Sequence, residues 1–177
     1  MDTPASLPLD NPFWRFSLRV YAVPKVAAEC LDLQRVNAIN VNMLLLCCWI
    51  AASRRVALTA GDIGSIEDAI KDWHALAVLP LRSVRDGIKS SIAMQDLEVQ
   101  ALRRKILSCE LDAERIEQAL IFQHAERLSM QQSAGAIADI MSGNIDLLRR
   151  LTPVARQQEI PLPVSALIEA SLVFPED

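Results

Sequence analysis

The stretch that decides the fold is IAMQDLEVQALRRKILSCELDAERIEQALIFQHAERLSM, residues 92–130, which contains neither proline nor glycine. Apolar residues recur along it at spacings that alternate between three and four. They are Val99, Leu102, Ile106, Cys109, Ala113, Ile116 and Leu120. This pattern, sustained over three heptads, predicts an α-helix that packs lengthwise against a partner.

The length of this stretch sets a condition on the fold. As one continuous helix it would extend about 58 Å, whereas a compact domain of 177 residues has a radius of gyration of about 16 Å. We therefore expect either a break, at Ser108–Cys109 or at Ser129, or a helix that projects and finds a partner along its length. A second copy of this chain, associating through residues 92–130, is one such partner.

Composition agrees with an all-α globular fold. Apolar residues make up 51% of the chain and aromatic residues 5%, and no sustained alternation of apolar and polar residues predicts a strand. We expect a single-domain bundle of about seven to nine helices over residues 11–177, after a flexible tail at 1–10. Residues 1–90 carry ten basic and nine acidic residues, and residues 91–177 carry eight and thirteen. The bundle thus combines an aromatic-rich half, 11–90, with an acidic half, 91–177.

Proline and asparagine mark where the shorter helices begin. Asn11 and Pro12 are typical of the N-cap and first position of a helix, and Pro24 starts a second helix. Asn40 caps a third helix over 41–55, which by composition is the most buried.

Glycine and proline interrupt the pattern further on. Gly61 and Gly64 weaken any long helix after Thr59, and Pro80 starts a new helix. A last short helix is expected at 164–172.

The longest apolar run, from Met43 to Ala52, is too short to cross a membrane. Ten residues span about 15 Å as a helix, half of a bilayer core. The first ten residues show no basic stretch followed by an apolar one, so we expect no secretory signal. The cysteines are Cys30, Cys47, Cys48 and Cys109. They form no CxxC pair, which indicates reduced thiols in a cytoplasmic protein.

Three segments together resemble a known family. They are NPFWRFSLRVYAVPKVAAECLDLQ at 11–34, NVNMLLLCCWIA at 40–51 and DWHALAVLPLRSVRDGIK at 72–89. The order FWxFSL, CLxLQ, VNxLL, a tryptophan and PLRxxR resembles a family of small, uncharacterised proteobacterial proteins. A looser similarity follows in SCELDAERIEQAL at 108–120. The resemblance implies a bacterial, cytoplasmic, helical protein and assigns no activity to any residue.

A basic stripe lies on the helix predicted after Pro80. Arg82, Arg85 and Lys89 are three and four residues apart, which places them on one helical face. The stripe is a candidate site for an anion, such as a phosphate or diphosphate, or for an acidic segment of a partner. The alternative is a solvated outer face of the bundle.

Asp68 and Asp72 are the candidate metal ligands. Their spacing of four matches the DxxxD pair that holds magnesium diphosphate in helical isoprenoid synthases. Such enzymes need a second acidic pair, for which Glu110 and Glu114 have the spacing. The alternative is an acidic first turn of a helix, where carboxylates interact favourably with the dipole. We expect no bound cofactor.

Trp49, Trp73 and His74 are candidates for the lining of an apolar pocket. The alternative is one aromatic-rich core cluster with the imidazole at its edge. Neither His74 nor His124 has a second ligand at the spacing of a metal motif, and the chain has no nucleophile elbow and no phosphate-binding glycine loop. We therefore predict no catalytic residue.

These features favour a non-enzymatic interaction or adaptor protein with an unknown protein partner. The alternative is a helical protein or enzyme that binds a small phosphorylated, lipid or isoprenoid ligand. Whether the chain is an enzyme stays open, although the missing catalytic motifs favour a non-enzyme. The net charge of −4 and isoelectric point near 5.2 argue against nucleic acid as a partner.

Overall fold

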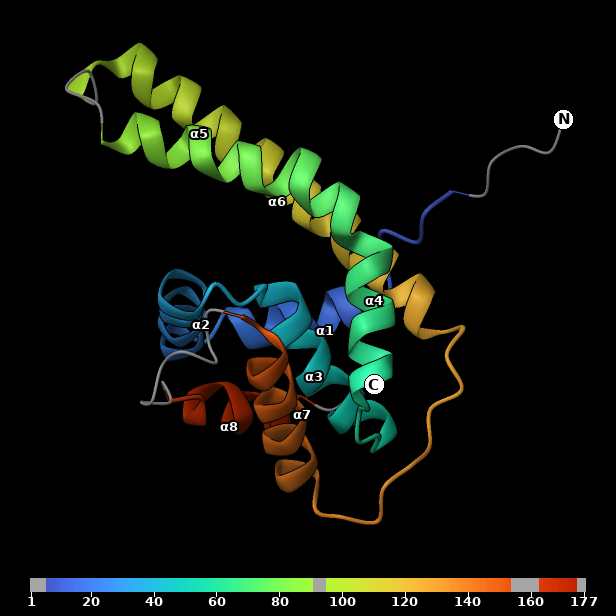
Figure 1. Cartoon of the computed structure of the whole chain (residues 1–177). Helices are drawn as coiled ribbons and strands as arrows, with labels where there is room; N and C mark the ends of the chain where they lie inside the picture. The colour runs from blue at the N-terminus through green and yellow to red at the C-terminus, as the bar shows by residue number, and fades with distance from the viewer. Residues whose placement is uncertain (1–5, 91–94, 154–162, 175–177) are drawn as a thin grey trace, which may run out of the picture.

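Helices make up nearly all the regular secondary structure of the computed structural model, which describes residues 6–90, 95–153 and 163–174 (Figure 1). They are α1 (Pro12–Tyr21), α2 (Pro24–Asn37), α3 (Val41–Arg54), α4 (Ala60–Trp73), the π-helical turn η1 (His74–Val78), α5 (Leu79–Lys89), α6 (Leu97–Ala125), α7 (Ile137–Leu151) and α8 (Ser165–Val173). Within these ranges the sole β-type pairing is an isolated bridge between Val56 and Gln132. The predicted all-α fold is confirmed.

The helix α3 forms the centre of the body. Every residue from Asn42 to Ala51 is buried, and α3 contacts α1, α2, α6, α7 and α8. The Trp49 ring packs against Phe13 and Phe122, with ring centroids 5.4 and 5.7 Å apart. The prediction that this helix is the most buried follows from its having no polar face.

Side-chain caps start α1 and α3 where the sequence predicts them. The Asn11 side chain accepts a hydrogen bond from Trp14 N at 2.8 Å, and the Asn40 side chain accepts one from Asn42 N at 2.8 Å. Pro24 opens α2 without a side-chain cap. These caps satisfy backbone donors that have no partner inside the helix.

The turn before α4 corrects one prediction. Gly61 and Gly64 were expected to weaken a helix here, yet both lie inside α4. A capping box offsets the helix stability that the two glycines cost. The Asp62 carboxylate accepts a hydrogen bond from Thr59 N at 2.8 Å, and the Asp62 backbone N–H donates to Thr59 Oγ1 at 3.1 Å.

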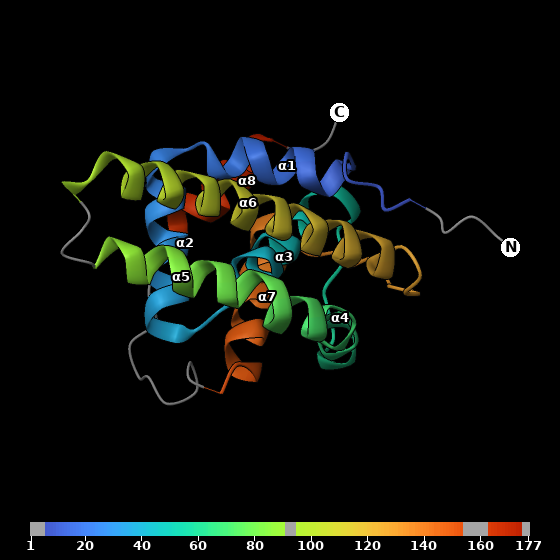
Figure 2. The same ribbon diagram turned by 90° about the horizontal axis from the view of Figure 1, so that it is seen from above.

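The elements α4, η1 and α5 follow one another from Ala60 to Lys89 without a loop, and α5 runs in a different direction from α4 (Figure 2). Because α5 begins at Leu79 with Pro80 in its first turn, the prediction of a helix that starts at Pro80 is confirmed to within one residue. Proline lacks an N–H and its ring would clash with the carbonyl four residues back. The wider π turn absorbs this defect, since Leu79 N–H donates to His74 O, five residues back. The hydrogen-bond spacing therefore widens from four residues to five for one turn, and the backbone stays helical from α4 into α5.

The helix α6 is unbroken over 29 residues and passes through Cys109. It folds back along α4, η1 and α5, and α5 and the facing part of α6 extend away from the body as a helical hairpin (Figures 1 and 2). Of the two alternatives, the break at Ser108–Cys109 does not occur and the helix with a lengthwise partner does, and this partner comes from the same chain. The predicted seam is also wrong in part, because Leu102 and Cys109 are exposed while Glu110 and Glu117 are buried.

The described residues contain no helix that combines the length and the apolar character required to span a bilayer. Residues 92–94 of the predicted long helix and residues 1–5 of the predicted tail lie outside the described ranges.

Candidate functional site

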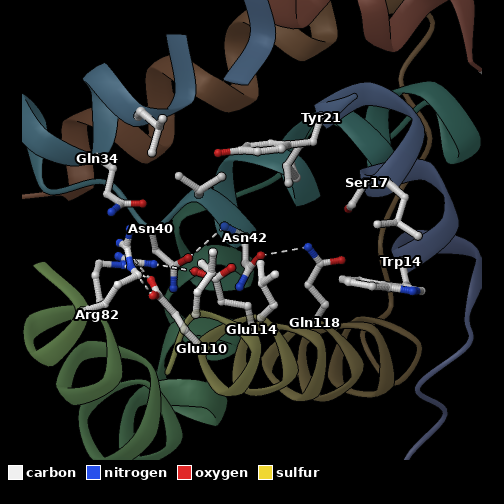
Figure 3. A pocket seen from close by; sticks show the side chains of 17 residues that line it. Trp14, Ser17, Tyr21, Gln34, Asn40, Asn42, Arg82, Glu110, Glu114 and Gln118 are labelled. Atoms are coloured by element: carbon white, nitrogen blue, oxygen red, sulfur yellow. Dashed lines mark hydrogen bonds and ion pairs between the residues drawn. The ribbon is translucent and has the colours of Figure 1, made fainter. Parts of the chain in front are cut away.

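A cavity of about 300 Å³ lies between α1, α2 and α3 on one side and the α5–α6 hairpin on the other (Figure 3). Its walls are largely apolar and include Trp14, Leu18, Tyr21, Leu31, Leu107 and Leu111. Its floor is polar and comes from the start of α3 and from α6. The volume is at the lower end of the range of about 300–1,000 Å³ for ligand pockets.

Paired charges close one end of the cavity. Arg82 Nε and Nη2 donate to Glu110 Oε1 at 3.2 Å and to Glu114 Oε1 at 2.7 Å. Arg85 Nε and Nη2 donate to the two oxygens of Glu110 at 2.5 and 3.3 Å. Two guanidinium groups on α5 thus face two carboxylates on α6, and all four line the cavity.

Further contacts occupy the same guanidinium groups. With its side-chain amide turned so that the oxygen faces Arg82, Gln34 of α2 accepts a hydrogen bond from Arg82 Nη1 at 2.9 Å. Arg85 Nη2 lies 3.3 Å from Asp86. The positive charge at this end is therefore balanced by carboxylates of the protein.

Below the cavity, Glu117 is completely buried and accepts several hydrogen bonds. Its Oε1 lies 2.6 Å from His74 Nδ1 and 3.3 Å from Asn40 Nδ2. Its Oε2 accepts from Asn42 Nδ2 at 2.5 Å. The π turn positions His74 for this contact, and the network compensates for burying the carboxylate.

The same network fixes the orientation of an amide in the cavity floor. Asn42 turns its Nδ2 toward Glu117 Oε2, which accepts the hydrogen bond, and its Oδ1 away. Asn42 Oδ1 then accepts from Gln118 Nε2 at 2.8 Å. Gln118 therefore presents its oxygen, a hydrogen-bond acceptor, at the other end of the chain of contacts.

Two residues that line the cavity each carry a buried polar atom with no protein partner among the described residues. The atoms are Gln118 Oε1 and Ser17 Oγ, and both side chains belong to residues that are 3% exposed. Figure 3 places Ser17 and Gln118 on the Trp14 side of the cavity, away from Arg82 and Glu110. Both atoms have almost no accessible surface, as do Ser171 Oγ and Arg103 Nε elsewhere in the described chain, so this pair by itself marks no ligand.

Burial also changes the acidity of groups in the wall. Desolvation raises the pKa of the Glu114 carboxyl, although the hydrogen bond and charge of Arg82 act in the opposite direction. Desolvation likewise raises the pKa of Tyr21 to about 12, so its hydroxyl stays protonated at neutral pH.

Comparison with known proteins identifies a family for this chain. The family is described as "Protein of unknown function (DUF2390)" and it matches residues 12–121. The chain belongs to this family. Neither the curated proteins nor the solved structures contain a match. All the residues that line the cavity, from Trp14 to Gln118, lie within the part that the DUF2390 family matches.

The predicted basic stripe is divided by the structure. Arg82 and Arg85 turn toward α6 and line the cavity, whereas Lys89 is exposed at the end of α5. The stripe is therefore not one uniformly solvated face. The anion site itself stays a prediction, and the carboxylates that pair with both arginines give it no support.

The predicted pocket residues lie around the cavity but do not line it. Trp73 Nε1 donates to the backbone oxygen of Ala113 at 2.9 Å, His74 contacts the floor through Glu117, and Trp49 is buried in the core. Trp49 belongs to the core cluster, whereas Trp73 lies outside it and His74 lines a second hollow. A role of these residues in a ligand pocket stays a prediction.

Asp68 and Asp72 are exposed on α4. Asp68 lines a second hollow together with Glu67 and His74, whereas Glu114 pairs with Arg82. Over residues 6–90, 95–153 and 163–174, no three or more His, Cys, Asp or Glu side chains are grouped so that they could hold a metal ion.

Ser17, Gln118 and Trp14 line the cavity but were not predicted from the sequence. Ser17 and Gln118 look like ordinary helical polar residues, because their burial depends on the packing of α1 across α6. The sequence does carry a signal for the carboxylates on α6. Glu110 and Glu117 are seven residues apart, which is the heptad spacing that places two residues on one face of a helix.

Proposed function

We propose that this protein binds a small amphipathic molecule in the cavity beneath the α5–α6 hairpin. The observation that carries the proposal is an apolar-walled cavity of about 300 Å³ with a polar floor, closed at one end by the ion pairs of Arg82 and Arg85. Apolar walls with a few placed polar groups are typical of small-molecule sites. The proposal corresponds to the small-molecule alternative drawn from the sequence, except that the ligand need not be phosphorylated.

A fragment screen by ligand-detected NMR tests this function. The library should contain amines, alcohols, amides and acids on small apolar bodies, at millimolar concentration. We expect hits that compete with one another for one site. A protein that binds no fragment would contradict the proposal.

A matched pair of variants locates the hits. Leu111 and Leu102 lie on the same helix and are each 52% exposed, but only Leu111 lines the cavity. Leu111→Trp should fill the mouth and weaken binding about tenfold or more, whereas Leu102→Trp should leave it unchanged. Equal binding by both variants would place the site elsewhere.

Self-association through the hairpin is a second candidate, in line with the interaction protein favoured by the sequence. Leu97 is 77% exposed, and Val84 and Leu102 are each about half exposed. Exposed apolar residues on a projecting element favour a protein interface. Sedimentation velocity over a range of concentrations should show a dimer that Leu97→Asp with Leu102→Asp dissociates; a monomer at every concentration would exclude it.

The unpaired cysteines are consistent with a protein that works in a reducing compartment, such as the bacterial cytoplasm. Cys30, Cys47 and Cys48 are buried and unpaired. Burial raises the pKa of Cys30 and Cys48 to about 12, which keeps these thiols protonated and unreactive.

A further inference from the structure

We infer that the cavity takes an uncharged ligand, a small apolar body with one neutral polar group that hydrogen-bonds to the Tyr21 hydroxyl. This inference rests on the proposed ligand-binding function and names the chemical class of the ligand. It follows from the balance of charges in the wall, from the hydrogen bonds of the floor and from the position of Tyr21.

The charged groups that line the cavity cancel one another. The lining contains two guanidinium groups and two carboxylates, those of Arg82, Arg85, Glu110 and Glu114. Arg82 donates to Glu114 at 2.7 Å, and Arg85 donates to Glu110 at 2.5 Å. These side chains are at most 26% exposed, so solvent screens the pairs only in part. The formal charges of the lining therefore sum to zero.

A charged ligand would gain little from this balanced wall. A cation beside Glu114 would also lie close to Arg82, which repels it. An anion beside Arg85 would in the same way meet the carboxylate of Glu110. Moving a charge out of water is costly unless it finds a partner of opposite charge. The cavity thus favours a ligand without a charge.

The polar floor is already hydrogen-bonded within the protein. Asn42 donates to Glu117 at 2.5 Å, and Gln118 donates to Asn42 at 2.8 Å. The side-chain oxygen of Gln118 has less than 1 Å² of accessible surface, so a ligand cannot reach it. The polar group of a ligand must therefore find its partner in the wall.

Tyr21 supplies this partner in the wall. It lines the cavity, and Figure 3 shows its ring extending from α1 across the cavity with the hydroxyl at the far end. The hydroxyl makes no hydrogen bond to the described residues, yet it is not one of the polar atoms that have lost their accessible surface. Desolvation raises its pKa to about 12, so at neutral pH it is an uncharged group that both donates and accepts. An alcohol, ether or carbonyl oxygen of a ligand matches it.

The apolar rim sets the remainder of the ligand. Leu18 of α1, Leu31 of α2 and Leu111 of α6 are each about half exposed and line the same cavity. An apolar body that covers them removes exposed apolar surface from water, which favours binding. The volume of about 300 Å³ limits this body to a short chain or a single ring.

A matched series of probes tests the inference. Benzyl alcohol, benzylamine, benzoate and toluene share one aromatic ring and differ in the group attached to it. Titration calorimetry at neutral pH should show that benzyl alcohol binds about tenfold or more tightly than benzylamine and benzoate, because both ions lose hydration without gaining an unpaired counter-charge.

Two neutralising variants test the charge balance, and they should shift the selectivity in opposite directions. Glu110→Gln leaves the guanidinium groups in excess, so benzoate should bind about tenfold more tightly. Arg85→Gln leaves the carboxylates in excess and should strengthen benzylamine by a similar factor. Asp112→Asn, which removes an exposed charge from α6 outside the cavity lining, should change neither. Circular dichroism checks that each variant is folded.

Tyr21→Phe assigns the polar contact. It keeps the ring and removes the hydroxyl, so benzyl alcohol should bind several-fold more weakly. Toluene has no polar group and should bind as before. An equal loss for both probes would show that Tyr21 only packs against the ligand, and it would overturn the assigned hydrogen bond.

The outcomes separate the inference from the function beneath it. If benzylamine or benzoate binds the parent as tightly as benzyl alcohol, and Leu111→Trp blocks that binding, the uncharged ligand is wrong while the ligand site stands. If no probe and no fragment binds, the proposed function fails. A preference for the alcohol that Glu110→Gln and Arg85→Gln both leave intact would also overturn the inference.

Discussion

The body around α3 and the α5–α6 hairpin are held together in opposite ways. The helix α3 buries ten consecutive residues, from Asn42 to Ala51, whereas α5 contains no buried residue. The body is fixed by apolar packing. The hairpin is fixed in large part by Arg82 and Arg85, which reach carboxylates on α6.

This difference explains where the cavity lies. Apolar side chains interdigitate until little space is left, whereas guanidinium–carboxylate pairs have a fixed reach and direction. The hairpin can therefore be held over α1 and α2 with an open volume beneath it. Stability resides in one region and the candidate site in the region with the fewer buried residues.

The largest expected effect comes from the body. Trp49→Ala removes a fully buried ring between Phe13 and Phe122, and it should lower the free energy of unfolding by about 3–5 kcal/mol. Urea denaturation followed by circular dichroism measures this change. The control is Leu76→Ala, which truncates an exposed side chain and should change stability by less than about 0.5 kcal/mol.

The comparison also separates what the sequence could predict from what it could not. The burial of α3 follows from its composition, and the caps at Asn11 and Asn40 follow from local hydrogen bonding. Such signals act within one helix. The contacts of Glu110 and Glu117 join different helices, and a carboxylate in a periodic pattern is normally assigned to solvent.

The remaining errors have one physical origin. A break at Ser108–Cys109 was one alternative for the long helix, because local propensity is weakest there. Tertiary packing of α4, η1 and α5 against α6 overrides this preference. The cavity could not be predicted for the same reason, since it exists only where α1, α2 and the hairpin meet.

The second expected effect is local to the hairpin. Glu110→Ala removes the carboxylate shared by Arg82 and Arg85, and it should lower stability by about 1–3 kcal/mol. Hydrogen exchange should accelerate more in α5 than in α3, because the hairpin loses the contacts that hold it. Asp112→Ala on the same helix is the control. Equal acceleration in both helices would show that the two regions unfold as one unit.

The smallest expected effect is a dependence on pH that arises in the cavity wall. Burial raises the pKa of Glu114 above its ordinary value of 4.5. As the pH rises above about 4.5, the unfolded chain therefore releases this proton before the folded chain does, and ionisation of Glu114 makes stability fall. The Glu114→Gln variant has no such proton. Between pH 4.5 and neutrality, the free energy of unfolding of the variant minus that of the parent should therefore increase.

Urea denaturation of the parent and of Glu114→Gln over this range measures the difference, and Asp112→Asn serves as the control for loss of an exposed charge. A difference that stays constant with pH would mean that Glu114 is as well solvated in the folded chain as in the unfolded one. A difference that grows would show that the carboxylate is held in the wall against its own tendency to be hydrated.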